Sequence, residues 1–318
     1  MTEYAVAKPN DRAGIIDFVN MVFSMDHRPH DFKKDLPKVY ADGAPWYDRA
    51  IHFVARDGET ILGNVALLPL DLYVNGKTLK TGFIGAVSTH PYHRGIGAMK
   101  TLMKMAEDYA RTHGFDMLEL GGQRQRYEYY GYKQMGLRRK FEVSKTNVRH
   151  VLGNVNADDI SVYEVTENDS ALLNEIHALH NALPIHVERP REAFLSIMHS
   201  WRGSLLAIKR DDTLIGYTVF QGLDDTYSEL ILRDYSDTSA ALKALIGKQE
   251  HKEFTFTAFS FQKDSIKALG KIAEGWNISF EMMVNILNPE NFYEVYPQKS
   301  DDNAELPCAL DFPGADMF

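Results

Sequence analysis

The feature of the sequence most able to do chemistry is a glycine-rich turn between a β run and a helical run. Unpaired N–H groups at the start of a helix converge on one point and can bind an anion. Glycine lets the backbone approach such a ligand closely, and an arginine adds positive charge for a phosphate. These residues predict an anion-binding turn, with an ordinary tight turn as the alternative: Arg94, Gly95, Ile96, Gly97, Ala98 and Met99.

Two other glycine motifs are excluded at this turn. It lacks the Gly-Lys-Ser/Thr of a P-loop, and it lacks the three glycines and the following acidic residue of a dinucleotide fingerprint.

The elements around the turn predict a parallel βαβ unit. A β run from Phe83 to Thr89 ends at His90-Pro91, and apolar residues then recur at helical spacing up to His113-Gly114. A second β run extends from Phe115 to Leu120. A strand, a turn, a helix and a strand in this order favour parallel pairing.

Upstream, the pattern predicts a helix and two hairpins. Ile15, Val19 and Val22 form one apolar stripe after the cap residues 10–11, and residues 26–45 are polar and rich in turn formers. We expect a first hairpin of strands 51–56 and 61–68, and a second of strands 70–73 and 79–83 around Asn75-Gly76.

An internal repeat predicts that the fold is duplicated. Residues 53–63 align without gaps on residues 206–216, at an offset of 153 residues. The turn, a threonine, two aliphatic residues and a glycine coincide. A helical pattern at 172–183 and β runs at 254–259 and 278–287 continue the parallel.

Together with the segment from Tyr127 to Tyr132, these elements resemble the GCN5-related N-acetyltransferase (GNAT) superfamily over residues 3–145. The resemblance implies an α/β fold of two tandem GNAT-like units, each a mixed, mostly antiparallel twisted sheet with a central parallel strand pair flanked by helices. It also implies that acetyl-CoA binds as co-substrate, its pyrophosphate in the turn 94–99 and its pantetheine along Val87, Ser88 and Thr89. Met99 departs from the Gly or Ala that the family places there.

The family also implies a general acid and an acceptor wall. Its tyrosine four residues before a Gly-Phe/Tyr pair corresponds to Tyr127, whose phenol could protonate the CoA thiolate. Tyr129, Tyr130 and Tyr132 are rivals for this role. Residues 26–46 lie where the family builds its acceptor wall, which makes Asp26, His27 and Trp46 candidate substrate contacts. The general base stays open, with His90 and Glu119 as weak candidates.

The tandem arrangement resembles the enhanced intracellular survival acetyltransferases without their sterol-carrier-like domain. The second half has no glycine turn after its β run at 231–232, which favours a degenerate partner. The predicted domains are a catalytic GNAT unit at 1–147, a degenerate GNAT-like unit at 158–290 and an extended tail at 291–318. In that family a terminal carboxylate acts as base, which would correspond to Phe318.

Composition limits the class of protein. The chain of 318 residues carries 35 basic and 44 acidic residues, a formal net charge of −9, which argues against nucleic acid as the main partner. The lone Cys308 excludes internal disulfides and a cysteine zinc site, and it makes an acyl-cysteine route a poor prediction. We expect no metal, no membrane partner and a cytoplasmic location, with oligomerisation left open.

The predicted function is an acetyl-CoA-dependent N-acetyltransferase that moves an acetyl group to a primary amine by direct attack. The acidic balance favours a cationic acceptor, either a small molecule or a lysine side chain. Two alternatives stay open: a non-catalytic acyl-CoA sensor, and a tandem GNAT peptidyltransferase that uses aminoacyl-tRNA.

Overall fold

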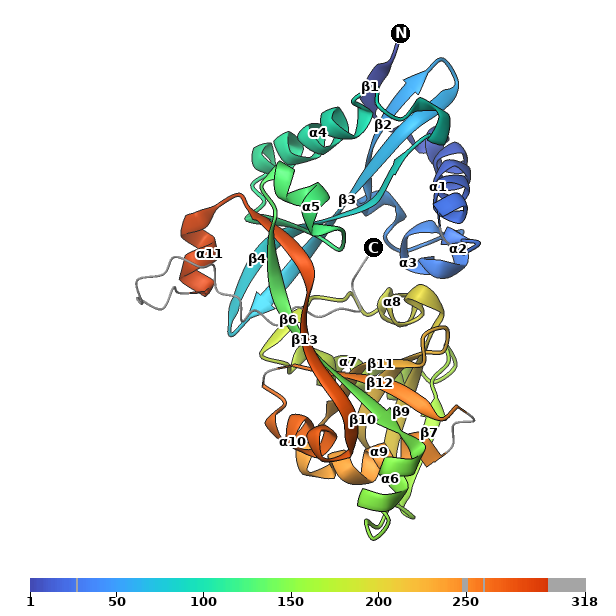
Figure 1. The fold of residues 1–318 in the computed structure, drawn as a ribbon, viewed down its shortest axis with the longest axis vertical. Helices are drawn as coiled ribbons and strands as arrows, with labels where there is room; N and C mark the ends of the chain where they lie inside the picture. Colours follow the sequence, from blue (N-terminus) through green and yellow to red (C-terminus); the bar gives the residue numbers. More distant parts are fainter. Residues whose placement is uncertain (27, 248–250, 260, 297–318) are drawn as a thin grey trace. The chain divides into compact units, whose positions relative to one another are not determined.

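The computed structural model describes residues 1–26, 28–247, 251–259 and 261–296 (Figure 1). Contacts group them into two compact units. Unit 1 consists of residues 1–135 with residues 281–296, and unit 2 consists of residues 136–280. Each unit is a mixed, mostly antiparallel sheet that contains a parallel strand pair and has flanking helices, which confirms the predicted fold class.

The sheet of unit 1 has the strand order β1-β2-β3-β4-β5-β13. The strands β4 and β5 form a parallel pair, as the βαβ pattern predicted, and β13 is antiparallel to β5. The strands are β1 Glu3–Val6, β2 Ile51–Asp57, β3 Thr60–Val74, β4 Lys77–Thr89, β5 Met117–Leu120 and β13 Ala273–Ile286.

Helices cover both faces of this sheet, with α1 on one side and α4 on the other (Figure 1). The apolar face of α4 includes Leu102 and Ala106, which pack on Phe53 and Val65 of the sheet. The helices are α1 Arg12–Asp26, α2 Phe32–Asp35, α3 Pro37–Tyr40, α4 Ala98–Thr112, α5 Arg124–Tyr127 and α11 Pro289–Val295.

Two predictions for this half differ from the structure. The two expected hairpins share one strand, because residues 61–68 and 70–73 both belong to β3, which continues through Pro69, and β4 likewise continues past Phe83 to Thr89. The strand β2 pairs with β3 only as far as Leu67, so a residue without an N–H is tolerated at Pro69. The segment expected as a polar turn contains α2 and α3, whose buried Phe32 and Val39 belong to the core.

The long hairpin carries a bulge in β4. Asn64 pairs with Ser88 and Ala66 with Gly85, so Val65 faces two residues, Ala86 and Val87. Ala86 has φ +48°, a left-handed conformation that costs free energy for any residue with a Cβ.

Two side chains donate hydrogen bonds to the backbone carbonyl oxygen at the bulge. The Asn64 Nδ2 donates to the Ala86 carbonyl oxygen at 2.9 Å, and the Ser88 Oγ donates to the same oxygen at 3.1 Å. The Asn64 Oδ1 lies 2.9 Å from His52 Nδ1. Because an amide oxygen only accepts, His52 must carry its proton on Nδ1.

Unit 2 repeats the arrangement of unit 1. Its sheet has the order β13-β6-β12-β11-β10-β9-β7, and its parallel pair is β11 with β12. The strands are β6 Lys133–Ser144, β7 Ile160–Glu164, β8 Ile185–Val187, β9 Gly203–Arg210, β10 Thr213–Gln221, β11 Thr226–Leu232 and β12 Glu253–Ala258. The helices are α6 Lys145–Val151, α7 Ser170–Asn181, α8 Phe194–Met198, α9 Thr238–Gly247 and α10 Lys263–Ile272.

The repeat seen in the sequence is preserved in the strand register. Ala55 pairs with Gly63 before an irregularity in the β2–β3 hairpin, and Ile208 pairs with Gly216 before the same irregularity in β9–β10. Both pairs are related by the offset of 153 residues. The duplication therefore extends from sequence to hydrogen-bond register.

Two strands each pass from one compact unit into the other. Residues 133–135 of β6 belong to unit 1 and the rest to unit 2, whereas β13 starts in unit 2 and ends in unit 1. The compact units therefore differ from the contiguous ranges 1–147 and 158–290 expected from the sequence. Residues 289–295 form the helix α11 rather than an extended tail, because the Asn288 side chain caps it and Phe292 is buried.

The carboxylate of Asp116 attaches this C-terminal segment to unit 1. Its Oδ1 accepts from Asn288 Nδ2 at 3.1 Å and from Asn291 Nδ2 at 2.8 Å, and its Oδ2 accepts from the Lys80 N–H at 2.9 Å. Asp116 is 6% exposed, so these bonds are shielded from water.

We expect Asp116→Ala to destabilise unit 1 by about 2–4 kcal/mol, because it removes three charge-assisted hydrogen bonds from a buried position. Urea unfolding would measure the loss, and limited proteolysis should show faster cleavage near α11. Asp108→Ala is the control, since Asp108 is exposed and pairs only across one helix turn with Lys104. Equal midpoints for both variants would contradict this account.

The burial of His52 gives a second expectation. Burial lowers the pKa of His52 to about 4 from an ordinary 6.5, and the hydrogen bond with Asn64 opposes that shift. Between these pH values the unfolded chain binds a proton that the folded chain excludes. The free energy of unfolding should therefore decline as the pH falls from about 6.5 toward 4. In His52→Asn the decline should be smaller, because the contribution of His52 is removed. Identical pH profiles of the urea midpoints of the parent and the variant would contradict this expectation.

Candidate functional site

The site arises where β4 separates from its parallel neighbour. The two strands pair only at Thr81↔Met117, Gly82↔Leu118 and Phe83↔Glu119, whereas β4 continues to Thr89. The contact at this point is close, since a Cβ on Gly82 would lie 2.7 Å from Leu118 Cδ2. Beyond Phe83, one edge of β4 is therefore free of β5.

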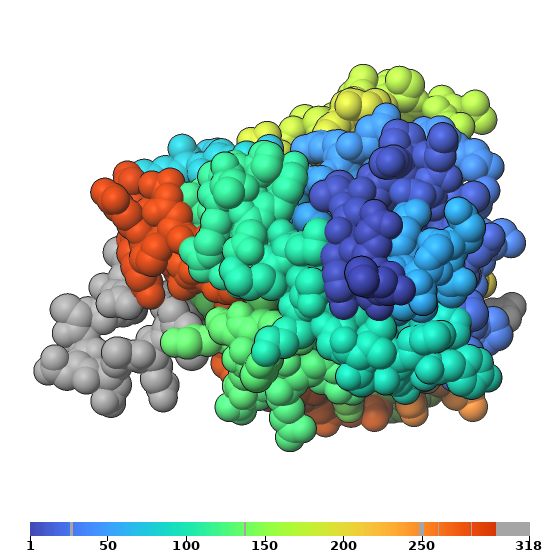
Figure 2. All heavy atoms as spheres, turned by 90° about the horizontal axis from the view of Figure 1, so that it is seen from above, coloured from blue at the N-terminus to red at the C-terminus, as the bar shows by residue number. Residues whose placement is uncertain are grey.

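A cavity of about 470 Å³ adjoins this part of β4. It brings together eight residues predicted from the sequence: Val87, Ser88, Thr89, Arg94, Gly95, Gly97, Ala98 and Met99. The predicted Ile96 is 44% exposed and is not among the lining residues. The teal atoms on the face shown in Figure 2 belong to the part of the chain around residue 100, which contains this turn.

The turn has the backbone expected of an anion cradle. Gly95 has φ +89° and Gly97 has φ +81°, and Gly97 is the N-cap of the 15-residue helix α4. A Cβ built on either glycine would meet no atom within 4 Å, so it would project into open space. The N–H groups at the start of α4 and the helix dipole favour a negative group at this point.

Two cations that the sequence analysis missed also line the cavity. Lys100 is in the first turn of α4, and Arg126 is in α5 Arg124–Tyr127. A hydrogen bond with the Tyr129 hydroxyl raises the pKa of Lys100, which keeps its charge. With Arg94, the described lining residues include three cations and no carboxylate. The spacing of Lys100 from the glycines was the signal that could have identified it.

Tyr127 is not among the residues that line this cavity. It is 6% exposed, and its ring packs so closely on Gly122 that a Cβ there would lie 2.4 Å from Tyr127 Cε2. Burial raises the pKa of Tyr127, while a hydrogen bond with Arg126 lowers it in part. The phenol is therefore protonated at neutral pH and is linked to the cavity through Arg126.

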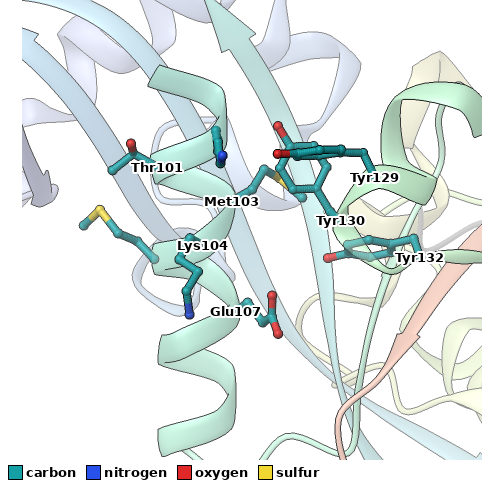
Figure 3. Close-up of a pocket in the computed structure, with 9 residues that line it drawn as sticks. Thr101, Met103, Lys104, Glu107, Tyr129, Tyr130 and Tyr132 are labelled. Atoms are coloured by element: carbon teal, nitrogen blue, oxygen red, sulfur yellow. The ribbon is translucent and has the colours of Figure 1, made fainter. Parts of the chain in front are cut away.

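The rival tyrosines lie along α4. Tyr129, Tyr130 and Tyr132 face this helix and line a second, mainly apolar cavity of about 350 Å³ (Figure 3). Tyr130 also lines the first cavity, so it is the tyrosine that contacts both. Asn285 Nδ2 from the C-terminal strand β13 donates to the Tyr130 carbonyl oxygen at 3.4 Å.

The structure places the predicted acceptor contacts Asp26 and Trp46 in different environments. Asp26 ends α1, whose Val22 lines the cavity, and His27 lies outside the described residues. Trp46 is 1% exposed and lies 5.5 Å from Lys38 Nζ, so its ring is part of the core.

The weak base candidates have structural partners. His90 Nδ1 accepts from the Tyr92 N–H at 3.3 Å, and Glu119 is buried in β5. Cys308 and Phe318 lie outside the described residues.

Nowhere in the described part of the chain do three His, Cys, Asp or Glu side chains gather as metal ligands would. Within the same residues, every helix is too short or too polar to cross a bilayer.

Comparisons with known proteins agree with this geometry. Residues 3–136 match the model of the acetyltransferase (GNAT) domain. A search of curated proteins found no match.

Solved structures of low identity share the fold. A conserved protein of unknown function from Enterococcus faecalis V583, named a probable N-acyltransferase, is 16% identical with a TM-score of 0.71, covering 93% of this chain and 75% of its own. A GCN5-related N-acetyltransferase from Kribbella flavida is 15% identical with a TM-score of 0.65, covering 92% and 73%. Eis1 from Mycobacterium abscessus is 12% identical with a TM-score of 0.62, covering 93% and 76%.

The family match spans the strand, turn, helix and strand that build the cavity, and the structural matches extend over both units. Residues 3–136 thus form a GNAT acetyltransferase domain.

Proposed function

We propose that this acyltransferase uses acetyl-CoA and transfers the acetyl group to a primary amine. The observation that carries the proposal is the cavity between the free edge of β4 and the start of α4, with three cations in its lining. A pyrophosphate fits the turn 94–99, because N–H groups and positive charge converge there. The pantetheine arm then lies along Val87, Ser88 and Thr89.

The amine nitrogen attacks the thioester carbonyl carbon directly and forms the C–N bond, the C–S bond breaks, and the sulfur departs with the electron pair. The nitrogen gives up one proton to solvent, from which the tyrosinate left by proton donation is reprotonated. We assign Tyr127 to protonate this thiolate, because burial raises its pKa and so keeps its proton at neutral pH. Arg126, which lines the cavity and hydrogen-bonds the Tyr127 phenol, is suited to hold the phenol in place.

The acceptor enters beside α1 in this proposal. Val22 of α1 lines the cavity, and Asp26 lies one helical turn further on. A carboxylate at this position suits an amine, as does the net charge of −9. The acceptor class is therefore a small amine or a lysine side chain, with His27 as a further proposed contact. The buried ring of Trp46 belongs to the core and is not proposed as a contact.

Calorimetric titration with acetyl-CoA, followed by thiol release over a panel of amines, tests the proposal. Acetyl-CoA should bind, and at least one amine should release CoA. Failure to bind any acyl-CoA would remove the enzyme proposal. Binding without turnover would favour the sensor, and turnover only with aminoacyl-tRNA would favour the peptidyltransferase.

Gly97→Ala tests the cradle. A methyl group there projects toward the proposed phosphate, so acetyl-CoA affinity should fall by about tenfold or more. Gly114→Ala is a matched control at the other end of α4: Gly114 has φ +69°, and its Cβ would also meet no atom within 4 Å. Both changes carry a similar backbone cost of about 1 kcal/mol, but only Gly97→Ala should weaken binding in the titration. Equal affinities of the two variants would refute the cradle.

Tyr127→Phe tests the acid. Turnover should fall by about ten- to a thousandfold while acetyl-CoA affinity stays nearly unchanged, because only proton donation is removed. Tyr132→Phe is the control, since Tyr132 is 3% exposed and its ring centroid lies 6.3 Å from that of Tyr127. Steady-state thiol release measures both variants. Unchanged turnover of Tyr127→Phe would end its assignment as the acid.

A further inference from the structure

The two units differ in the strand that leads toward the ligand. In unit 1, the extra residue of β4 lies between the pairs Asn64↔Ser88 and Ala66↔Gly85. The offset of 153 residues places Tyr217 of unit 2 where unit 1 has Asn64. There the pairing is regular, with Tyr217↔Ile231, Thr218↔Leu230 and Val219↔Glu229, and an irregularity follows only after Val219. The bulge at this place is therefore specific to the unit with the cradle.

The residue at the shared position makes different contacts in each unit. In unit 1, the Asn64 amide donates to the carbonyl oxygen of the left-handed Ala86. In unit 2, the Tyr217 hydroxyl donates to Glu229 Oε2 at 3.2 Å, and Glu229 is paired with Arg189 at 2.6 Å. Tyr217 thus bonds a side chain of the neighbouring strand, whereas Asn64 bonds its backbone.

The orientation of Asn64 is determined by its two partners. The Ala86 carbonyl can only accept, so it requires the Nδ2 of Asn64, and this places Oδ1 against the Nδ1–H of His52. Asn64 is 0% exposed and His52 is 7% exposed. Water therefore competes little for these bonds.

The bulge changes the edge toward which the backbone groups of β4 point in the residues that follow Ala86. One extra residue reverses the alternation of a strand, so the backbone groups that follow face opposite edges from those in a regular ladder. The residues directly after Ala86 are Val87, Ser88 and Thr89, which line the cavity at the edge that β5 has left.

We propose that Asn64, oriented by His52, is a positioning residue that holds the bulge at Ala86 and so directs the backbone of Val87–Thr89 toward the pantetheine arm of the acyl donor. The pantetheine part rests on the proposed function. The part that concerns the bulge rests on the strand register and hydrogen bonds alone.

Asn64→Leu removes the amide at similar volume. We expect acetyl-CoA affinity to fall about tenfold, the effect of one buried hydrogen bond, with unchanged affinity for adenosine 3′-phosphate 5′-diphosphate, the part of CoA without pantetheine. Thr81→Val is the matched control, because Thr81 is also fully buried in β4 and its Oγ1 donates to the Leu70 carbonyl oxygen at 3.1 Å outside the bulge. The control should bind both ligands as the parent does.

Amide hydrogen exchange without ligand tests the bulge independently. Exchange at Ala86–Ser88 should change in Asn64→Leu and stay unchanged in Thr81→Val. Asn64→Ala, which adds no bulk, gives the same test if the leucine variant does not fold. Parent-like exchange and affinity in the Asn64 variants would overturn the proposal, as would equal weakening of both ligands. If the parent binds no acetyl-CoA, the proposed function fails, and exchange alone decides the role of Asn64.

Discussion

The separation of β4 from β5 after Phe83 is the constraint on which the rest of the site depends. If β4 remained paired with β5 up to its end, the backbone of residues 84–89 would form hydrogen bonds with β5 and could not bind a ligand. Here three pairs hold the strands together at one end, and Gly82 permits the close approach that this requires. The edge that is released is next to the start of α4, so strand edge and helix terminus offer their unpaired groups to the same cavity. This combination suits a ligand with an amide-containing arm and a phosphate group.

Local patterns in the sequence were sufficient for the elements with short-range signals. The glycine turn, the α4 stripe and the repeated hairpin depend on spacing within about 15 residues, and the structure places them as predicted. The repeat was informative because both copies of the pattern form hairpins with the same strand register. The eight predicted residues in the cavity lining follow from this local agreement.

The features that the sequence did not reveal depend on contacts far apart in the chain. Pro69 suggested a strand end, yet β3 continues through it, because the pairing of β2 with β3 has already ended at Leu67. Residues 289–295 have the composition of a tail, but Phe292 is buried in the core. Asn291 donates a hydrogen bond to Asp116, which is 175 positions earlier in the chain. Lys100 and Arg126 belong to separate helices, and only folding brings their charges to one cavity. The bulge at Ala86 is invisible in composition because alanine has no preference for a left-handed backbone.

The passage of β13 from unit 2 into unit 1 has a consequence for biosynthesis. At translation rates of roughly 5–20 residues per second, residues 281–296 leave the ribosome on the order of ten seconds after residue 135. Through that interval β5 lacks its antiparallel neighbour and Asp116 lacks Asn288 and Asn291. The first unit to be synthesised is thus completed only after the second unit has been translated.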